Sequence, residues 1–113
     1  MIDELIILKD MPKVSLNQWY SGSHWTKRKK LKDKYKILIK SQFKGVFSKE
    51  KKYIVSYDFN FKKRPLDASN CVAMVKMIED IIFEDDSFKI VKKITITSNK
   101  SKESCILVKI KEL

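Results

Sequence analysis

Four short stretches of the chain carry the apolar and β-branched residues that are typical of β-strands. The clearest is 53–62, in which every second residue from Tyr53 is valine, tyrosine or phenylalanine, so it predicts a half-buried strand with one apolar face. The other three stretches are 4–9, 89–97 and 104–111. Residues 98–102 between the last two are turn formers, which predicts that these two strands form a hairpin.

Two longer segments show the spacing of an amphipathic helix instead. The first, 24–43, follows Ser23, which is a candidate N-cap. Its apolar stripe consists of Leu31, Tyr35, Leu38 and Ile39. The second helix is predicted to begin at a Ser69 or Asn70 cap and to end near Phe83. Its apolar arc consists of Cys71, Met74, Val75, Ile78, Ile81 and Ile82.

The segment 11–24, between the first strand and the first helix, contains Pro12, Gly22 and three serines, and predicts a loop. The order β-α-β-α-β-β predicts one α+β domain over residues 1–113, with a single mixed sheet of about four strands and two helices packed on it. A chain of 113 residues with 43% hydrophobic residues is long enough for one core and short for two.

Composition excludes several classes of protein. No apolar run approaches the ~20 residues that cross a bilayer, and residues 1–4 do not resemble a secretory signal, so we expect a cytoplasmic protein with no membrane partner. Cys71 and Cys105 lack the spacing of a zinc site, and because both lie in apolar stretches they are expected to be buried free thiols. With two glycines in the chain, a phosphate- or dinucleotide-binding loop is absent, and no small organic cofactor is expected.

The charge of the chain points to a polyanionic partner. The net charge is +11, which favours nucleic acid over an anionic membrane surface. Residues 23–52 carry 12 basic residues against 2 acids, a net charge of +10, whereas residues 67–86 carry 6 acids against 1 lysine, a net charge of −5. A protein that only coats nucleic acid gains nothing from acids that repel phosphate. A metal-dependent nuclease needs them, because carboxylates hold divalent cations.

The basic run supplies the candidate DNA-binding residues. Seven cations lie within residues 27–36, close in sequence to Trp19, Tyr20 and Trp25, and this combination favours a phosphate-contacting helix over an ordinary solvated face. The candidates are Lys27, Arg28, Lys29, Lys30 and Lys32, together with Lys63 and Arg64 at the end of the strand 53–62.

Acidic residues also mark both ends of the second helix. Asp67 precedes it, Lys76 and Asp80 share an exposed face, and Asp85 and Asp86 follow its end. Each has an ordinary explanation as a dipole partner, a surface ion pair or a turn residue. The adjacent aspartates are the hardest to explain in this way, because the dipole of a helix C-terminus and their mutual repulsion both disfavour them. A bound cation would relieve both.

Taken together, these positions resemble the RusA-type Holliday junction resolvases, most closely their phage-encoded branch. The matching string is Asp67-x-x-Asn70, then Lys76, Asp80 and Asp85-Asp86-Ser87, preceded by Ser15-Leu16-Asn17-x-x-Tyr20 and His24-Trp25. The resemblance spans residues 12–95. It implies a Mg²⁺-dependent endonuclease, with Mn²⁺ as an alternative ion. Such an enzyme acts as a homodimer and nicks four-way or other branched DNA symmetrically, in the cytoplasm of a bacterial host or phage-infected cell.

The resemblance also implies roles for individual residues. Asp67 and Asp86 match catalytic metal ligands, with Asp85 beside them, and Lys76 matches a lysine that stabilises charge on the scissile phosphate. Asn70, Asp80 and Asp85 match supporting positions. The chain departs from the family at Ser69, where better-studied members have an aspartate. The spacing from Asn70 to Lys76 is also longer, and the link from Asp80 to the paired aspartates is shorter.

A straight helix from Asn70 to Phe83 is about 20 Å long at ~1.5 Å per residue and would hold Asp67 and Asp86 apart. Mg²⁺ ligands must lie within about 2.1 Å of the ion. Either the helix breaks early and residues 83–86 fold back, or a two-fold axis brings Asp67 of one subunit beside Asp86 of the other. We favour the second arrangement.

Three functions are compatible with the sequence. The first is a junction-resolving nuclease, the second is a non-enzymatic basic nucleic-acid-binding module, and the third is a subunit that binds an acidic protein. Mg²⁺-dependent cleavage separates the first from the others, and salt-sensitive DNA binding separates the second from the third.

Overall fold

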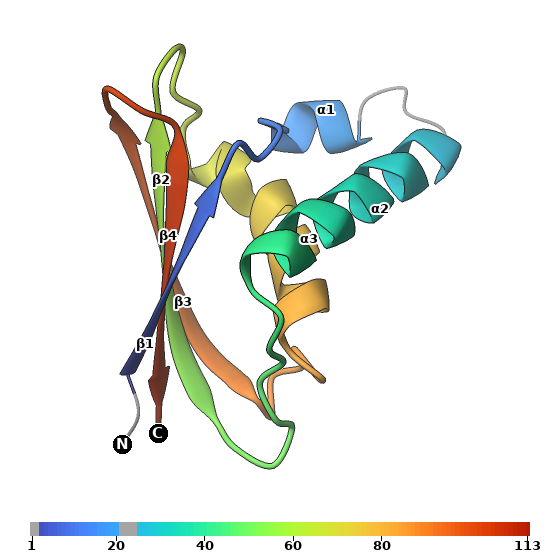
Figure 1. Ribbon diagram of the computed structural model, residues 1–113, viewed down its shortest axis with the longest axis vertical. Coiled ribbons are helices and arrows are strands. Elements are labelled where there is room, and N and C mark those ends of the chain that lie inside the picture. Colours follow the sequence, from blue (N-terminus) through green and yellow to red (C-terminus); the bar gives the residue numbers. More distant parts are fainter. Residues whose placement is uncertain (1–2, 21–24) are drawn as a thin grey trace.

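The computed structural model describes residues 3–20 and 25–113, so the predicted cap at Ser23 lies outside the described residues. Eight elements follow one another along the chain. They are β1 (Asp3–Lys9), α1 (Leu16–Tyr20), α2 (Trp25–Gln42), β2 (Tyr53–Phe61), the 3₁₀ helix η1 (Ala68–Cys71), α3 (Val72–Ile82), β3 (Val91–Lys100) and β4 (Cys105–Glu112). The helices lie on one face of a single sheet, as Figure 1 shows with the sheet edge-on. This arrangement confirms the predicted α+β class and the mixed four-stranded sheet.

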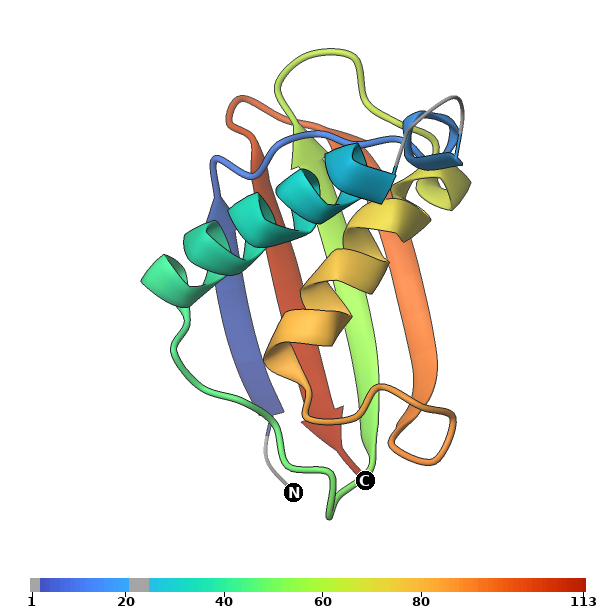
Figure 2. The same ribbon diagram turned by 90° about the vertical axis from the view of Figure 1, so that its right-hand side faces the viewer.

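The strand order is β1-β4-β2-β3. β4 pairs antiparallel with both β1 and β2, and β2 pairs parallel with β3. A parallel pair requires a crossover, and η1 and α3 provide it across the face that Figure 2 presents to the viewer. The same helical face carries α2, which lies across the sheet beside α3.

The predicted hairpin between the last two strands is wrong. β3 and β4 lie on opposite sides of β2 and do not pair with each other. The turn residues allow the chain to reverse, but burial decides which strand takes the central place. β4 offers Ile106, Val108 and Ile110 to the core, all nearly inaccessible, whereas β3 is largely exposed and forms an edge.

The core lies between the sheet and the helices. β2 alternates buried and half-buried residues along its full length, as its sequence pattern predicts. Tyr35 and Ile39 of α2 are completely buried in this core, in agreement with the predicted stripe. α3 is buried almost all round, and Lys76 and Asp80 are its only exposed side chains. The two residues of that helix that carry charge to the surface therefore both belong to the candidate site.

The predicted loop over 11–24 contains a helix that sequence reasoning missed. The main-chain N–H of Gln18 donates to Ser15 Oγ (3.0 Å), and the N–H of Ser15 donates to Gln18 Oε1 (2.9 Å). This reciprocal pair is a capping box, and its Ser-x-x-Gln pattern is a sequence signature of a helix N-terminus. It begins the one-turn helix α1, which buries the side chain of Trp19 against the core. Within residues 3–20 and 25–113 there are therefore three α-helices, where the sequence predicts two.

The second predicted helix begins differently in the structure, whereas its end near Phe83 is confirmed, because Phe83 is the C-cap residue. Neither Ser69 nor Asn70 caps it, because both lie inside the 3₁₀ turn η1 that precedes α3. At the other end the helix stops at Ile82, and Phe83 is extended (φ −112°, ψ 140°). Phe47 accounts for this end: its N–H donates to the Ile82 carbonyl (2.7 Å), and its carbonyl accepts the N–H of Glu84 (3.1 Å). This bridge pulls the chain away from the helix axis.

None of the helices in the described residues combines the length and apolar character that a bilayer-spanning helix requires. Cys71 and Cys105 are both free thiols, as predicted. Cys71 is buried, but the predicted burial of Cys105 is wrong, because this residue is only half-buried on β4.

Candidate active site

The end of α3 at Ile82 brings two predicted site residues together. Asp86, in the loop after the helix, folds back to Asp80 on the last turn of α3, and the two carboxyl groups share a hydrogen bond. Partial burial raises the pKa of Asp80, and the negative charge and hydrogen bond of Asp86 raise it further. Lys32 and Lys76 act on the same carboxyl in the opposite direction. Two carboxylates held this close, with cations beside them, are the chemical centre of the site.

Glu79 is a third acid at this centre, and sequence reasoning did not single it out. Its side chain is only 8% exposed, and Tyr57 Oη of β2 donates a hydrogen bond of 3.0 Å to Glu79 Oε1. Burial raises the pKa of Glu79 to about 7, with further increases from Asp86 and Asp80 that the Tyr57 hydrogen bond opposes. The available signal was an acid next to Ile78 in a mostly apolar helix, but its partner on β2 is visible only in the fold.

Lysines of α2 line a groove that reaches this centre. The groove lies between α2 and α3, has a volume of about 340 Å³, and includes Asp80 among its lining residues. Its other lining residues are Lys32, Asp33, Lys36, Lys40, Met77 and Ile81. Lys32, Lys36 and Lys40 are spaced four residues apart, so they follow one face of α2. A polyanion in this groove would be guided by positive charge towards the carboxyl pair.

The structure keeps Asp67 at the opposite end of this helical segment. It occupies the N-cap position of η1, and its carbonyl accepts the N–H of Asn70 (2.8 Å) and the Cys71 thiol (3.6 Å). Burial raises the pKa of Cys71 to about 11, and the nearby negative charge of Asp67 adds to the increase. Eleven residues of α3 separate this end from Asp86's end, or about 16 Å at ~1.5 Å per residue.

Asp85 faces its own loop. Its Oδ1 accepts the N–H of Ser87 (2.8 Å), which lowers the pKa of the Asp85 carboxyl, as do Lys89 and Lys49 to a smaller extent. The structure thus joins Asp86 with Asp80, a predicted supporting residue, and leaves Asp85 as part of the turn that positions Asp86. In the part of the chain that the structure describes, no three His, Cys, Asp or Glu side chains are arranged to hold a metal ion.

The predicted DNA-binding residues fall in two places. On α2, Lys27, Lys29, Lys30 and Lys32 are exposed and Arg28 is half-buried. Lys29 forms an ion pair with Asp33 (3.6 Å), while Arg28 and Lys32 lie over the Trp19 ring at 6.0 and 5.8 Å. The Trp19 ring therefore packs into the core and also faces two cations of α2.

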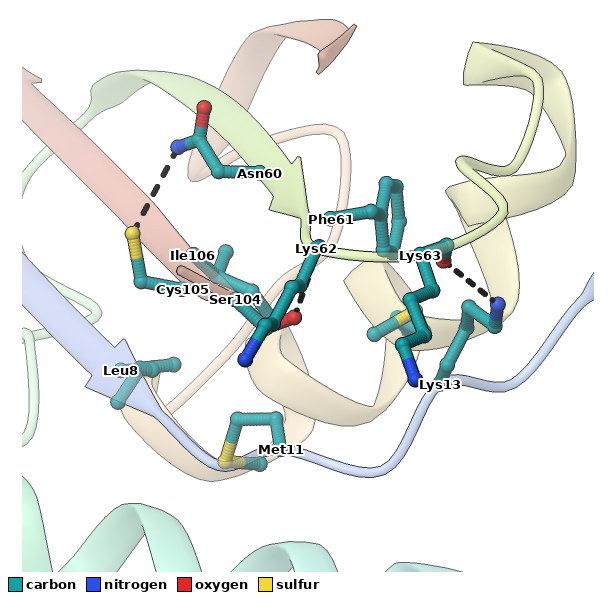
Figure 3. Close-up of a pocket in the computed structure, with 11 residues that line it drawn as sticks. Leu8, Met11, Lys13, Asn60, Phe61, Lys62, Lys63, Ser104, Cys105 and Ile106 are labelled. Atoms are coloured by element: carbon teal, nitrogen blue, oxygen red, sulfur yellow. Dashed lines mark hydrogen bonds between the residues drawn. The ribbon is translucent and has the colours of Figure 1, made fainter. Parts of the chain in front are cut away.

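Lys63 and Arg64 lie instead in the exposed loop after β2. Arg64 has a positive φ of 48°, a left-handed conformation that non-glycine residues rarely adopt. Lys13 Nζ donates to the carbonyls of Lys63 (3.2 Å) and Arg64 (2.9 Å) and holds the loop in this shape. Figure 3 shows Lys13, Lys62 and Lys63 around a pocket of about 300 Å³ beside this loop. Lys62, Lys63 and Arg64 belong to the loop that leads to Asp67, and Lys13 binds this loop from the segment before α1.

Comparison with known proteins finds no family model that matches the chain and no curated protein that matches it significantly. The resemblance to the RusA-type resolvases therefore rests on the motif residues themselves, now placed in the fold.

Proposed function

We propose that this protein is a Mg²⁺-dependent, structure-selective endonuclease that hydrolyses phosphodiester bonds of branched DNA. The observation that carries the proposal is the Asp80–Asp86 carboxyl pair beside Lys32 and Lys76, at the end of a lysine-lined groove. Acidic residues that serve only solubility are expected to stay apart, because two carboxylates within hydrogen-bond distance repel each other. The motif residues of the resemblance supply the choice of reaction.

The donor set fits Mg²⁺. This ion is bound in proteins by one or two carboxylates, with water and substrate phosphate completing its shell. Asp80 and Asp86 supply two carboxylates that lie close to each other. Bound there, the ion would supply a water of lowered pKa and a positive charge for the phosphate oxygens.

The remaining residues act on the DNA and on the carboxylates. Lys76, one helical turn before Asp80, places a positive charge where the phosphate becomes more negative during hydrolysis. Tyr57 holds Glu79 in place beneath the carboxyl pair. Lys32, Lys36 and Lys40 contact the phosphates of the strand that enters the groove, without reading its sequence.

In this proposal Asp67 acts in a homodimer, as a ligand supplied to the site of the other subunit. Within one subunit Asp67 lies at the far end of η1 and α3 from the carboxyl pair. A two-fold axis that brings Asp67 of one subunit to Asp86 of the other would add a third carboxylate and create two equivalent sites, as symmetric nicking requires.

The test uses the full chain with labelled DNA. A four-way junction and a linear duplex of the same sequence are incubated with the protein in Mg²⁺, in Mn²⁺ and in EDTA. We expect cleavage of the junction in either metal, little cleavage of the duplex and none in EDTA. Equal cleavage of junction and duplex, or full activity in EDTA, would contradict the proposal.

A non-enzymatic nucleic-acid-binding module is the second candidate. It is favoured by the absence of a three-ligand metal group within residues 3–20 and 25–113 and by Ser69 at the family's aspartate position. Tight, salt-sensitive DNA binding without cleavage in any metal would establish it. A subunit that binds an acidic protein would show neither property.

A further inference from the structure

Phe88 is the most exposed large apolar side chain among the described residues, at 76% of its full accessibility. It lies in the loop between α3 and β3, two residues after Asp86. A single exposed apolar residue is common on protein surfaces and needs no explanation by itself. Three further features of this loop distinguish Phe88 from such a residue.

The loop is fixed at both ends. Phe83 before it and Ile90 after it are buried, at 4% and 8% exposure. The Ser87 carbonyl accepts the N–H groups of Ile90 and Val91, both at 3.0 Å, and the Ser87 N–H is bound to the Asp85 carboxylate. Buried residues and hydrogen bonds thus fix the loop, and in this fixed conformation the aromatic ring of Phe88 is exposed to solvent.

A lysine side chain lies over the ring, and further lysines belong to the same region. Lys92 Nζ lies 5.8 Å from the ring centroid of Phe88, and Lys89 is exposed next to it in sequence. Lys49 joins the same loop, where its N–H donates to the Glu84 carboxylate (3.3 Å). An aromatic ring flanked by lysines is the combination with which proteins bind unpaired nucleotides, since the base stacks on the ring and the cations contact the phosphates.

The position of the ring matters as much as its surroundings. Asp86 carries the chemistry of the proposed function, and only Ser87 separates it from Phe88. A base that stacks on Phe88 would therefore place its own phosphates near the carboxyl pair. In a linear duplex the bases are already stacked on one another, whereas a branch point interrupts that stacking and leaves bases accessible.

We propose that Phe88 stacks on a DNA base exposed at a branch point and thereby makes the protein prefer branched over linear DNA. The proposal rests on the proposed function for its ligand, DNA. It assigns the structural selectivity to one side chain, Phe88, and the phosphate contacts beside it to Lys89 and Lys92.

The test measures binding in EDTA, so that no cleavage is needed for a result. A four-way junction with 2-aminopurine at the branch point and a matched linear duplex are titrated with wild type and with F88A, F88L and F88W. We expect F88A to bind the junction about 5- to 140-fold more weakly, which is a stacking energy of about 1–3 kcal/mol at ~1.4 kcal/mol per tenfold. Duplex binding should not change, and F88W should restore junction binding.

The controls separate stacking from other roles of the side chain. L5A removes an apolar side chain that is 53% exposed on β1 and should leave junction binding unchanged. Wild-type quenching of 2-aminopurine should be lost in F88A and in F88L, because leucine offers no aromatic face. Equal junction binding by wild type and F88A would overturn the proposal. So would full binding by F88L, which would make Phe88 a simple apolar contact, such as one for a protein partner.

The outcome also distinguishes this proposal from the one on which it rests. A protein that shows Phe88-dependent junction preference but no cleavage in any metal would contradict the nuclease and support the stacking role. A metal-dependent nuclease whose junction preference is the same in F88A would contradict the stacking role alone.

Discussion

The two ends of the η1–α3 segment carry similar sequence signals but differ in structure. At the beginning, Asp67 caps a 3₁₀ turn, and its carbonyl is bound by Asn70 and Cys71. At the end, Asp80 and Asp86 share a hydrogen bond above the buried Glu79. In this protein, Asp86 reaches another acid of the helix because a second segment bends the chain after α3, whereas Asp67 binds within its own turn. Here Phe47 bends it, by pairing with the main chain on both sides of Phe83.

The largest effect on cleavage is expected from Asp86→Asn, and it should distinguish Asp86 from its neighbour Asp85. Loss of one carboxylate of the pair should reduce junction cleavage by about 100-fold or more, while DNA binding is kept or improved because a charge that repels phosphate is removed. Asp85→Asn is the matched control, because Asp85 accepts only a local N–H and should retain most activity. Cleavage and binding are measured on the same labelled junction. Similar losses in both variants would mean that the loop conformation matters rather than the Asp86 carboxylate.

Mixed dimers connect the two ends of the segment directly. Asp67→Asn and Asp86→Asn subunits should each be inactive alone, whereas their heterodimer should contain one site with both aspartates intact. We expect it to nick one strand of the junction, at about half the wild-type rate of nicking. Purified heterodimers with two different tags allow this measurement. If they cut no better than either parent, Asp67 and Asp86 do not act in one shared site.

A smaller effect should distinguish the groove from the rest of the basic surface. Charge reversal of Lys32 and Lys36 should weaken junction binding and lower the slope of log affinity against log salt by about 0.9 for each lost phosphate contact. Lys111→Glu, on the exposed end of β4, is the control for net charge and should leave the slope unchanged. Binding titrations at several salt concentrations measure both. An equal change of slope in the control would show that the whole surface, and not the groove, binds DNA.

The smallest effect concerns stability at the buried end. Glu79 has a folded-state pKa of about 7, above its ordinary value of 4.5, so the folded protein holds a proton that the unfolded chain has released. The free energy of unfolding should therefore fall as pH rises from about 4.5 to about 7, and then level off. Glu79→Gln should remove most of this decline in urea titrations. A decline of the same size in Glu79→Gln would assign it to other groups.

Tyr57→Phe tests the hydrogen bond between Tyr57 of β2 and Glu79. It removes the hydroxyl that donates to Glu79 and leaves a buried carboxyl group without this partner. We expect a loss of about 1–3 kcal/mol in unfolding free energy, measured by urea titration at pH 8. Tyr53→Phe is the control, because its hydroxyl donates to the Ser48 carbonyl at a distance from Glu79. An equal loss in the control would mean that the hydroxyl of Tyr57 has no special role.

The sequence determined the elements that depend on local periodicity. The alternation in 53–62 fixed the position of β2, and the apolar stripe with Tyr35 and Ile39 fixed the buried side of α2, because each pattern places side chains on one face regardless of the partner. It also determined the strong separation of positive and negative charge along the chain. The capping box at Ser15 and Gln18 was equally local, and could have been found from the residues alone.

Only the tertiary structure decided the order of the strands, the segment that pairs with the end of α3 and the membership of the candidate site. Which strand occupies the centre of the sheet depends on the total apolar area that each can bury, and the turn at 98–102 carries no information about it. The sequence placed the end of α3 near Phe83, but it did not reveal that Phe47, 35 residues earlier, binds the main-chain groups there. Glu79 joins the acids through a hydrogen bond from another strand. Contacts between residues far apart in sequence have no local periodicity, so the pattern of the chain could not reveal them.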